Sequence, residues 1–217
     1  MERNKFAPIM KALNRLADVA VDEFFVSKGL EIGKIGILIH RKKNAYGYCY
    51  TMENWEVSGE KVREIALTPD CLKSGKDQIL NTLLHECVHA YNSHNGIKDG
   101  EGRNHNKNFK KSCDLIGLGC EKCKGVGHRT SPELNSEECR QRFEMVFQRL
   151  DEEDDRVLSN LSELLPDVDE EKEKKKKDRN LLKYICLTCG AKARAKKEAN
   201  LICGDCMEQM VCEEDVD

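Results

Sequence analysis

The feature that most constrains this 217-residue chain is the run His85-Glu86-Cys87-Val88-His89, because its chemistry requires a helix. Residues four apart lie on one helical face, so the two imidazoles can bind the same metal ion. Glu86 lies about 100° further around the helix, where its carboxylate can reach a water on that metal without binding the metal itself. This arrangement is typical of zinc hydrolases.

The residues around this motif have helical spacing. Between Asp77 and Asn95, apolar side chains recur at steps of three and four residues. Asp77 is the predicted N-cap and Gly96 the predicted C-terminal stop. We therefore favour a metal-binding helix over a surface helix whose two histidines bind no metal. The apolar positions are Leu80, Leu83, Leu84, Cys87, Val88 and Tyr91.

Apolar periodicity elsewhere predicts a small α+β fold. A helix of about five turns is expected over residues 6–24, and another begins near Asn106. Alternation over residues 35–39, 46–50 and 62–67 predicts three short strands in an antiparallel or mixed sheet. One or two further helices are expected between Cys139 and Pro166. The tyrosines at 46, 48 and 50 are expected to cover one face of the sheet and could border a groove.

Composition suits one domain of ordinary size with appendages, since 35% of the residues are charged and 39% hydrophobic. No apolar run approaches the roughly 20 residues that cross a bilayer, and the N-terminus has no signal-peptide core. We expect a soluble, cytoplasmic protein with no membrane partner. Its 12 cysteines are then better interpreted as metal ligands and reduced thiols than as a disulfide framework.

A catalytic zinc usually has three protein ligands, so the two motif histidines need a partner. Asn92 and Asn95 occupy the positions where a metzincin would have glycine and histidine, which excludes that class. Spacing favours His105, at the start of a predicted helix, as the third ligand. An acid such as Glu133 or Glu137 remains an alternative third ligand. The other histidines are His40, His94 and His128, and His94 would point away from the motif face.

A second metal site is predicted near the C-terminus, where Cys186-x-x-Cys189 and Cys203-x-x-Cys206 are separated by 13 residues. This is the spacing of two facing knuckles that bind one zinc through four thiolates. A closed site of this kind folds a small module and performs no chemistry. Gly190 and Gly204 are expected to supply the turns. A third site is less favoured, because its spacing is irregular: Cys120, Cys123, His128 and Cys139.

The net charge of −3 gives no overall attraction to nucleic acid, so any such binding needs a local patch. Residues 98–111 contain five bases and two acids, whereas the lysine run in 167–179 is neutralised by acids and is interpreted as a solvated linker. The bases at 192–197 face a zinc-thiolate centre of about two negative charges, which offsets them.

The segments LLHECVHA, HNKNF, YICLTCG and LICGDC, in that order, resemble the SprT-like family of zinc metallopeptidases, which includes the Spartan-type DNA-protein crosslink proteases. The resemblance covers most of residues 30–118 and then 181–212. It implies a small zincin-like core, zinc ligation by His85, His89 and His105, and Glu86 as the base. Asn106 departs from the family pattern, which has glycine after the third histidine.

The predicted domains are a peptidase core at 1–132, a helical extension with a charged linker at 133–180, and a four-cysteine zinc ribbon at 181–217. We expect one catalytic and one structural zinc, and peptide-bond hydrolysis by a water that Glu86 deprotonates. Substrates would be proteins, with DNA as activator or scaffold implied by the resemblance. The alternatives are a non-catalytic zinc module that binds nucleic acid or protein, and a regulator that retains the metal but cleaves nothing.

Overall fold

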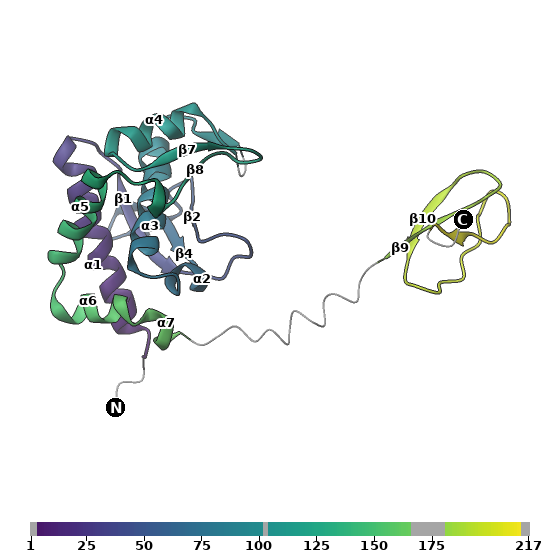
Figure 1. Ribbon diagram of the computed structural model, residues 1–217, viewed down its shortest axis with the longest axis horizontal. Coiled ribbons are helices and arrows are strands. Elements are labelled where there is room, and N and C mark those ends of the chain that lie inside the picture. Colours follow the sequence, from purple (N-terminus) through teal and green to yellow (C-terminus); the bar gives the residue numbers. More distant parts are fainter. Residues whose placement is uncertain (1–3, 102–103, 166–180, 214–217) are drawn as a thin grey trace. The chain divides into compact units, whose positions relative to one another are not determined.

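The computed structural model describes residues 4–101, 104–165 and 181–213 (Figure 1). The chain divides into two compact units, residues 1–166 and 167–217, and each is described by itself. The charged segment predicted as a linker at 167–179 lies outside the described residues. None of the described helices combines the length and the apolar character that crossing a bilayer requires.

The first unit contains a mixed four-stranded sheet built around its longest strand. That strand, β4 (Glu60–Leu67), pairs in parallel with β1 (Lys34–Ile39) and antiparallel with β2 (Gly47–Cys49) and β3 (Trp55–Val57). The sequence predicts only three of these strands. The fourth, β3, is short and fully exposed, so it has no alternating burial pattern, and it is joined to β4 by a two-residue turn at Ser58 and Gly59 with positive φ.

Helices α1 to α7 accompany this sheet, and the motif helix lies at the centre of the unit (Figure 1). The first helix, α1 (Ala7–Phe24), confirms the predicted 6–24 within one residue. The motif helix, α3 (Lys76–His94), contacts β2, β4, α1 and α4 (Lys107–Ile116). The remaining helical segments are α2 (Pro69–Leu72), α5 (Glu137–Gln148), α6 (Glu152–Ser159), α7 (Leu161–Leu164) and the 3-10 turns Val26–Lys28 and Pro132–Leu134.

The start of α3 differs from the prediction. Its N-cap is Gly75, with φ of 88°, and Asp77 lies inside the first turn without capping it. A positive φ at the cap favours glycine, and Asp77 instead stabilises the positive end of the helix dipole. At the other end, Gly96 has φ of 67° directly after the C-cap Asn95, so the predicted stop is confirmed.

Helices α5 to α7 pack into the same hydrophobic core as α1 and α3. Phe143 of α5 contacts Phe24 of α1 edge to face, with ring centroids 5.8 Å apart. Leu158 and Leu161, from α6 and α7, are each only 1% exposed. There are three helices where one or two were predicted: the side chain of Asp151 caps α6 after α5 ends, and the chain breaks again at Asn160 before the short helix α7.

Two small hairpins follow α3 and form one wall beside it. The first joins β5 (Gly100–Glu101) to β6 (Asn104–His105), and the second joins β7 (Cys120–Cys123) to β8 (Gly127–Thr130). The backbone amide of His105 donates to the carbonyl of Val126, which ties the first hairpin to the second. Together with the sheet, these elements confirm the predicted α+β class.

The second unit is a small three-stranded sheet, in the order β10 (Lys192–Ala195), β9 (Leu182–Ile185), β11 (Val211–Cys212). Its buried cluster is small and includes two of the predicted zinc ligands. The members are Tyr184, Cys186, Cys203, Met210 and Cys212. So little apolar area does not by itself stabilise a domain, which is the usual reason for a structural metal in a module of this size.

Candidate active site

Three histidines from two distant parts of the chain converge in the first unit. His85 and His89 lie one turn apart on α3, and His105 comes from β6. Their ligand atoms all lie within 4.8 Å of one another, and Nε2 of His89 is 3.1 Å from Nε2 of His105. The structure therefore brings together the three histidines that the sequence singles out.

A different partner holds the Nδ1 atom of each of these rings. Nδ1 of His85 pairs with the hydroxyl of Thr130 at 3.0 Å, Nδ1 of His89 donates to Asp99 at 2.7 Å, and Nδ1 of His105 donates to the carbonyl of His128 at 2.7 Å. With Nδ1 occupied, Nε2 is the free ligand atom on each ring. The carboxylate of Asp99 and the carbonyl of His128 can only accept, so they fix the tautomers of His89 and His105, and all three partners fix the ring orientations.

The resulting donor set fits a metal ion. Because the Nδ1 atoms of His89 and His105 carry the protons, their Nε2 lone pairs face each other at 3.1 Å, and a cation between them removes the repulsion. Metal–nitrogen bonds of about 2.0–2.1 Å in a tetrahedral arrangement place two nitrogens about 3.3 Å apart. Three imidazoles with an open fourth position are the ligand set of many catalytic zinc sites.

Burial keeps two of the rings in the neutral form that a metal requires. It holds the pKa of His85 well below its usual value and also lowers the pKa of His105. Burial likewise opposes the charged form of His89, but the hydrogen bond to Asp99 and the nearby acids outweigh it and raise the pKa of His89. The same bond lowers the pKa of Asp99 against the effect of its own burial.

Glu86 is buried beside the three histidines, with only 5% of its surface exposed. Burial raises the pKa of this carboxyl to about 7, although the neighbouring His89 and Lys42 and the backbone amide of Cys49 favour its ionised form. A carboxyl with this pKa can both accept and return a proton near neutral pH. Glu86 therefore has the position and the acidity expected of a general base.

Strand β2 runs so close to Glu86 that a glycine is required at position 47. A Cβ on Gly47 would lie 3.0 Å from Oε1 of Glu86 and 2.9 Å from Cγ2 of Thr82. No sequence pattern identifies Gly47, because its role arises from the contact between β2 and α3.

A cleft of about 480 Å³ opens over Glu86 and the three histidines. One side is formed by residues 42–51, which include β2, and the other by the two hairpins, with Asp99, Val126 and Arg129 among the lining residues. Tyr48 lines it as well, so one of the three predicted tyrosines borders the groove. Glu86 and the three histidines therefore lie at a cleft that a ligand can enter.

The other candidate ligands lie elsewhere. Glu133 and Glu137 are exposed and belong to no metal-binding group among the described residues, and His94 packs against Gly33. His128 contributes its backbone carbonyl to His105, while its ring bonds back to the carbonyl of His105. The irregular cysteine set at 120, 123 and 139 does not converge either.

Several polar residues that support the ligands were missed. Asn92 donates to Asp99 and accepts from the hydroxyl of Ser112, and Asn81 donates to Thr130. Both asparagines are at most 1% exposed. Asn81 precedes His85 by four residues and Asn92 follows His89 by three, so both lie on the motif face. Polar residues at these spacings were a signal that could have been found.

Asn106, which departs from the family pattern, caps helix α4. Its side chain accepts from the backbone amides of Asn108 at 2.7 Å and Phe109 at 3.3 Å, with an ordinary φ of −91°. The ring of Phe109 then stacks on His105 with centroids 4.2 Å apart. Asparagine therefore supplies a cap that glycine lacks, and it keeps the turn that presents His105.

The second unit brings together the side chains of Cys186, Cys189, Cys203 and Cys206, whose sulfur atoms lie within 4.8 Å of one another. Sγ of Cys189 and Sγ of Cys203 are 3.5 Å apart, close to the roughly 3.8 Å of two thiolates on one tetrahedral zinc. Four sulfur donors, with no fifth group among the described residues, make this a candidate closed metal site.

The two knuckles have matching backbones but different turn residues. In the first, the amide of Gly190 donates to the carbonyl of Cys186, and in the second the amide of Met207 donates to Cys203. Gly190 has φ of 74° and Met207 has φ of 57°. The expectation that Gly204 supplies the second turn is therefore wrong, because the left-handed position falls one residue after the cysteine pair, on Met207.

Comparison with known proteins gives one match. A family model described as the SprT-like family matches residues 13–126, just over half of the chain. Neither the curated proteins nor the solved structures include a significant match to the chain. The matched segment contains α3, the first hairpin, strand β7 and all three convergent histidines.

Proposed function

Because the chain belongs to the SprT-like family, we propose that it is a zinc-dependent metallopeptidase whose zinc is held by His85, His89 and His105. The observation that carries this proposal is the convergence of three oriented imidazoles beside a buried glutamate. Zinc in such a site would lower the pKa of a water toward about 7 and polarise the peptide carbonyl.

Glu86 carries the proton transfers in this proposal. Its carboxylate accepts a proton from the attacking water and then returns it to the nitrogen of the leaving amine. The hydrogen bond from the backbone amide of Cys49 and the contact with Gly47 hold the carboxylate on the cleft side of α3. Asp99, Thr130 and the carbonyl of His128 keep the three imidazoles in place during the reaction.

The position of β2 supports a peptide as the substrate. This strand lies at the end of the strand order β1-β4-β2, and its residues Gly47, Tyr48 and Cys49 line the cleft. Backbone groups at a free strand edge bind an extended peptide by adding it as a further strand. The outer edge of β2 next to Glu86 would therefore align a scissile bond with the site.

In the second unit, Cys186, Cys189, Cys203 and Cys206 would hold a structural zinc. Four thiolates leave no open position for a substrate, so this ion would stabilise the module and take no part in catalysis.

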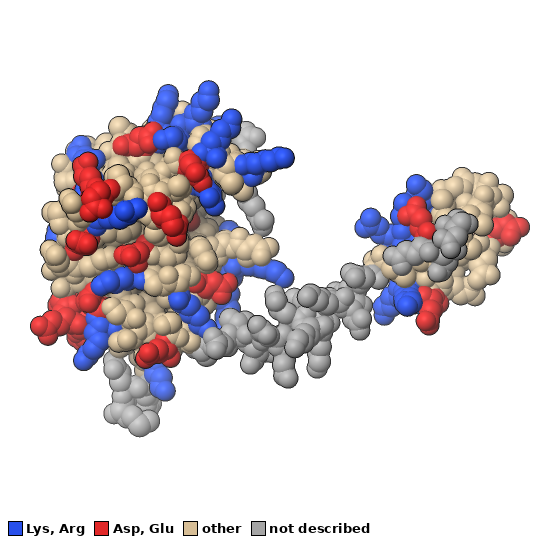
Figure 2. Space-filling view, viewed as in Figure 1, with Lys and Arg blue, Asp and Glu red and all other residues tan. Residues whose placement is uncertain are grey.

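We extend the proposal to proteins bound on DNA, in line with the family resemblance. Figure 2 shows lysines and arginines over the end of the first unit that carries α4, β7 and β8. Lys107, Lys111, Lys122 and Lys124 are exposed there, next to the hairpins that border the cleft. A basic surface of this kind attracts the phosphate backbone without reading sequence. Cleavage measured with and without single-stranded and duplex DNA tests this part.

The decisive experiment for peptidase activity is Glu86→Gln. Metal content should persist while cleavage of an unfolded protein disappears, and the exposed Glu144→Gln serves as the matched control that retains activity. A non-catalytic zinc module, or a regulator that cleaves nothing, predicts instead that wild-type protein with full metal content leaves the substrate intact. Unchanged cleavage by Glu86→Gln would refute the role of Glu86.

A further inference from the structure

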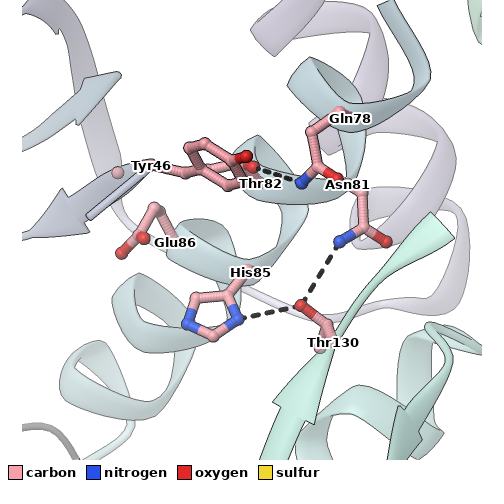
Figure 3. A pocket seen from close by; sticks show the side chains of 8 residues that line it. Tyr46, Gln78, Asn81, Thr82, His85, Glu86 and Thr130 are labelled. Atoms are coloured by element: carbon pink, nitrogen blue, oxygen red, sulfur yellow. Dashed lines mark hydrogen bonds between the residues drawn. The ribbon is translucent and has the colours of Figure 1, made fainter. Parts of the chain in front are cut away.

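A second cavity, of about 200 Å³, lies beside Glu86 toward the N-terminal end of α3. Gln78, Asn81 and Thr82 face it at helical spacings of three and four residues before His85 and Glu86. Figure 3 shows these side chains on one face of α3, with Thr130 from β8 near Asn81 and His85, and with Tyr46 toward β2. The cavity is therefore built from α3, β8, Tyr46 and Gly47, the first residue of β2.

This cavity adjoins the cleft but does not reach all three histidines. His85, Glu86, Gly47 and Thr130 line both spaces, whereas His89, Asp99 and His105 line only the cleft. Its volume is below the roughly 300–1,000 Å³ of small-molecule sites, so it suits a single side chain.

Five of its eight lining residues carry polar, uncharged side chains, and Glu86 is the only lining residue that can be charged near neutral pH, because burial keeps His85 neutral. The deeper polar groups are already paired: Asn81 donates to Thr130 and accepts from Asn135, and the amide nitrogen of Gln78 donates to Thr82 at 3.1 Å. Asn81 is 1% exposed and Thr82 is 6% exposed. The floor is therefore a fixed hydrogen-bonded surface.

Two groups nearer the solvent retain unused hydrogen-bonding capacity. Oε1 of Gln78 and the hydroxyl of Tyr46 have no hydrogen-bond partner among the described residues. Together they offer an acceptor and a group that both donates and accepts. A ligand side chain with an amide or a hydroxyl can satisfy both.

This inference rests on the proposed function, because the role of Glu86 in the reaction determines which substrate residue lies in the cavity. Glu86 returns its proton to the leaving nitrogen, so that nitrogen must lie within hydrogen-bonding distance of the Glu86 carboxylate. The Cα that bears the side chain of the same residue is bonded directly to that nitrogen. The cavity adjoins Glu86 and excludes His89 and His105, so it is the space next to that residue.

We propose that this cavity binds the side chain of the residue immediately after the scissile bond and selects glutamine, asparagine, serine or threonine there. An acidic side chain would lie against Glu86 with no cation in the lining. A lysine would pair with Glu86 and occupy the base, and an aliphatic side chain would leave Oε1 of Gln78 without a partner.

The test compares full-length wild type with Gln78→Leu on a mixture of reduced, alkylated and unfolded proteins of known sequence, with cleavage sites mapped by mass spectrometry. Wild type should cleave before amide and hydroxyl residues about tenfold more often than before leucine or methionine. Gln78→Leu should reverse or abolish that preference, and Tyr46→Phe should weaken it. The exposed Gln141→Leu on α5 is the matched control and should leave the preference unchanged.

The outcomes separate this inference from the proposed function. Cleavage with no preference after the scissile bond, or a preference that Gln78→Leu leaves intact, would overturn the inference while the peptidase stands. If wild type cleaves nothing, the peptidase itself is refuted. Peptide binding to the Glu86→Gln protein then still tests the chemistry of the cavity. The inference is supported if a glutamine peptide binds more tightly than its leucine analogue and this difference is lost when Gln78→Leu is added. Equal binding of the two peptides overturns the inference.

Discussion

The carboxylate of Asp99 accepts a 2.7 Å hydrogen bond from Nδ1 of His89, ten residues earlier in the chain. Asn92 donates to the same oxygen at 2.9 Å, so the carboxylate is itself held in place. Contacts of this kind orient a metal-binding imidazole and increase its basicity. The loop after α3 therefore contributes to the metal site although it supplies no ligand before His105.

Replacing Asp99 should weaken metal binding. In Asp99→Ala, Nδ1 of His89 loses its acceptor, and zinc affinity should fall about 10- to 100-fold. Competition with a chromophoric chelator measures the change. Asp114→Asn removes an exposed carboxylate that pairs with Lys110 and should leave the affinity unchanged. Equal affinities for Asp99→Ala and wild type would show that the carboxylate does not orient the ring.

Adding one methyl group at position 47 should impair catalysis while metal binding remains. In Gly47→Ala the new Cβ would lie 3.0 Å from Oε1 of Glu86, so the carboxylate must shift. The shift needed at a 3.0 Å contact is a few tenths of an ångström, so kcat should fall by less than the roughly 100-fold that a displacement of about 1 Å can cost. The measurements are kcat and bound zinc. Gly36→Ala, whose Cβ meets only Val62 at 3.4 Å, is the control expected to retain activity.

Truncating Phe143 should destabilise the whole first unit. The ring is 4% exposed and contacts Phe24 of α1, so Phe143→Ala should lower the free energy of unfolding by about 3–5 kcal/mol. Urea denaturation followed by circular dichroism measures this. Met145→Ala on the exposed face of α5 should change it by less than about 0.5 kcal/mol. A similar small change for Phe143→Ala would mean that α5 is not part of the cooperative core.

Removing one thiolate from the second unit should cost one metal ion and leave the first unit intact. Cys206→Ser leaves three of the four sulfur ligands, and bound zinc should fall from two ions per chain to one. Metal analysis together with peptidase activity measures both effects. Loss of both ions would contradict the assignment of separate sites, and so would an unchanged content. Cys123→Ser, outside both metal groups, is the control.

Much of the fold was accessible from local pattern. Helix α1 and the stop of α3 at Gly96 follow from apolar spacing and from the φ that glycine allows. Strand β3 was missed because three exposed residues have no alternating burial. Asp77 was misplaced as a cap because an acid in the first turn gives the same sequence signal as a cap residue.

The sequence alone determined the features that depend on spacing along one element. His85 and His89 lie on one helical face because they are one turn apart, and each CxxC pair forms a knuckle because two intervening residues close it. Tertiary structure decided the rest: the approach of His105, the partners Asp99 and Thr130, and the need for Gly47. These relationships join residues from different elements, and their geometry follows from how β2 and the two hairpins pack against α3. The spacing of apolar residues within one helix or strand carries no information about how different elements pack.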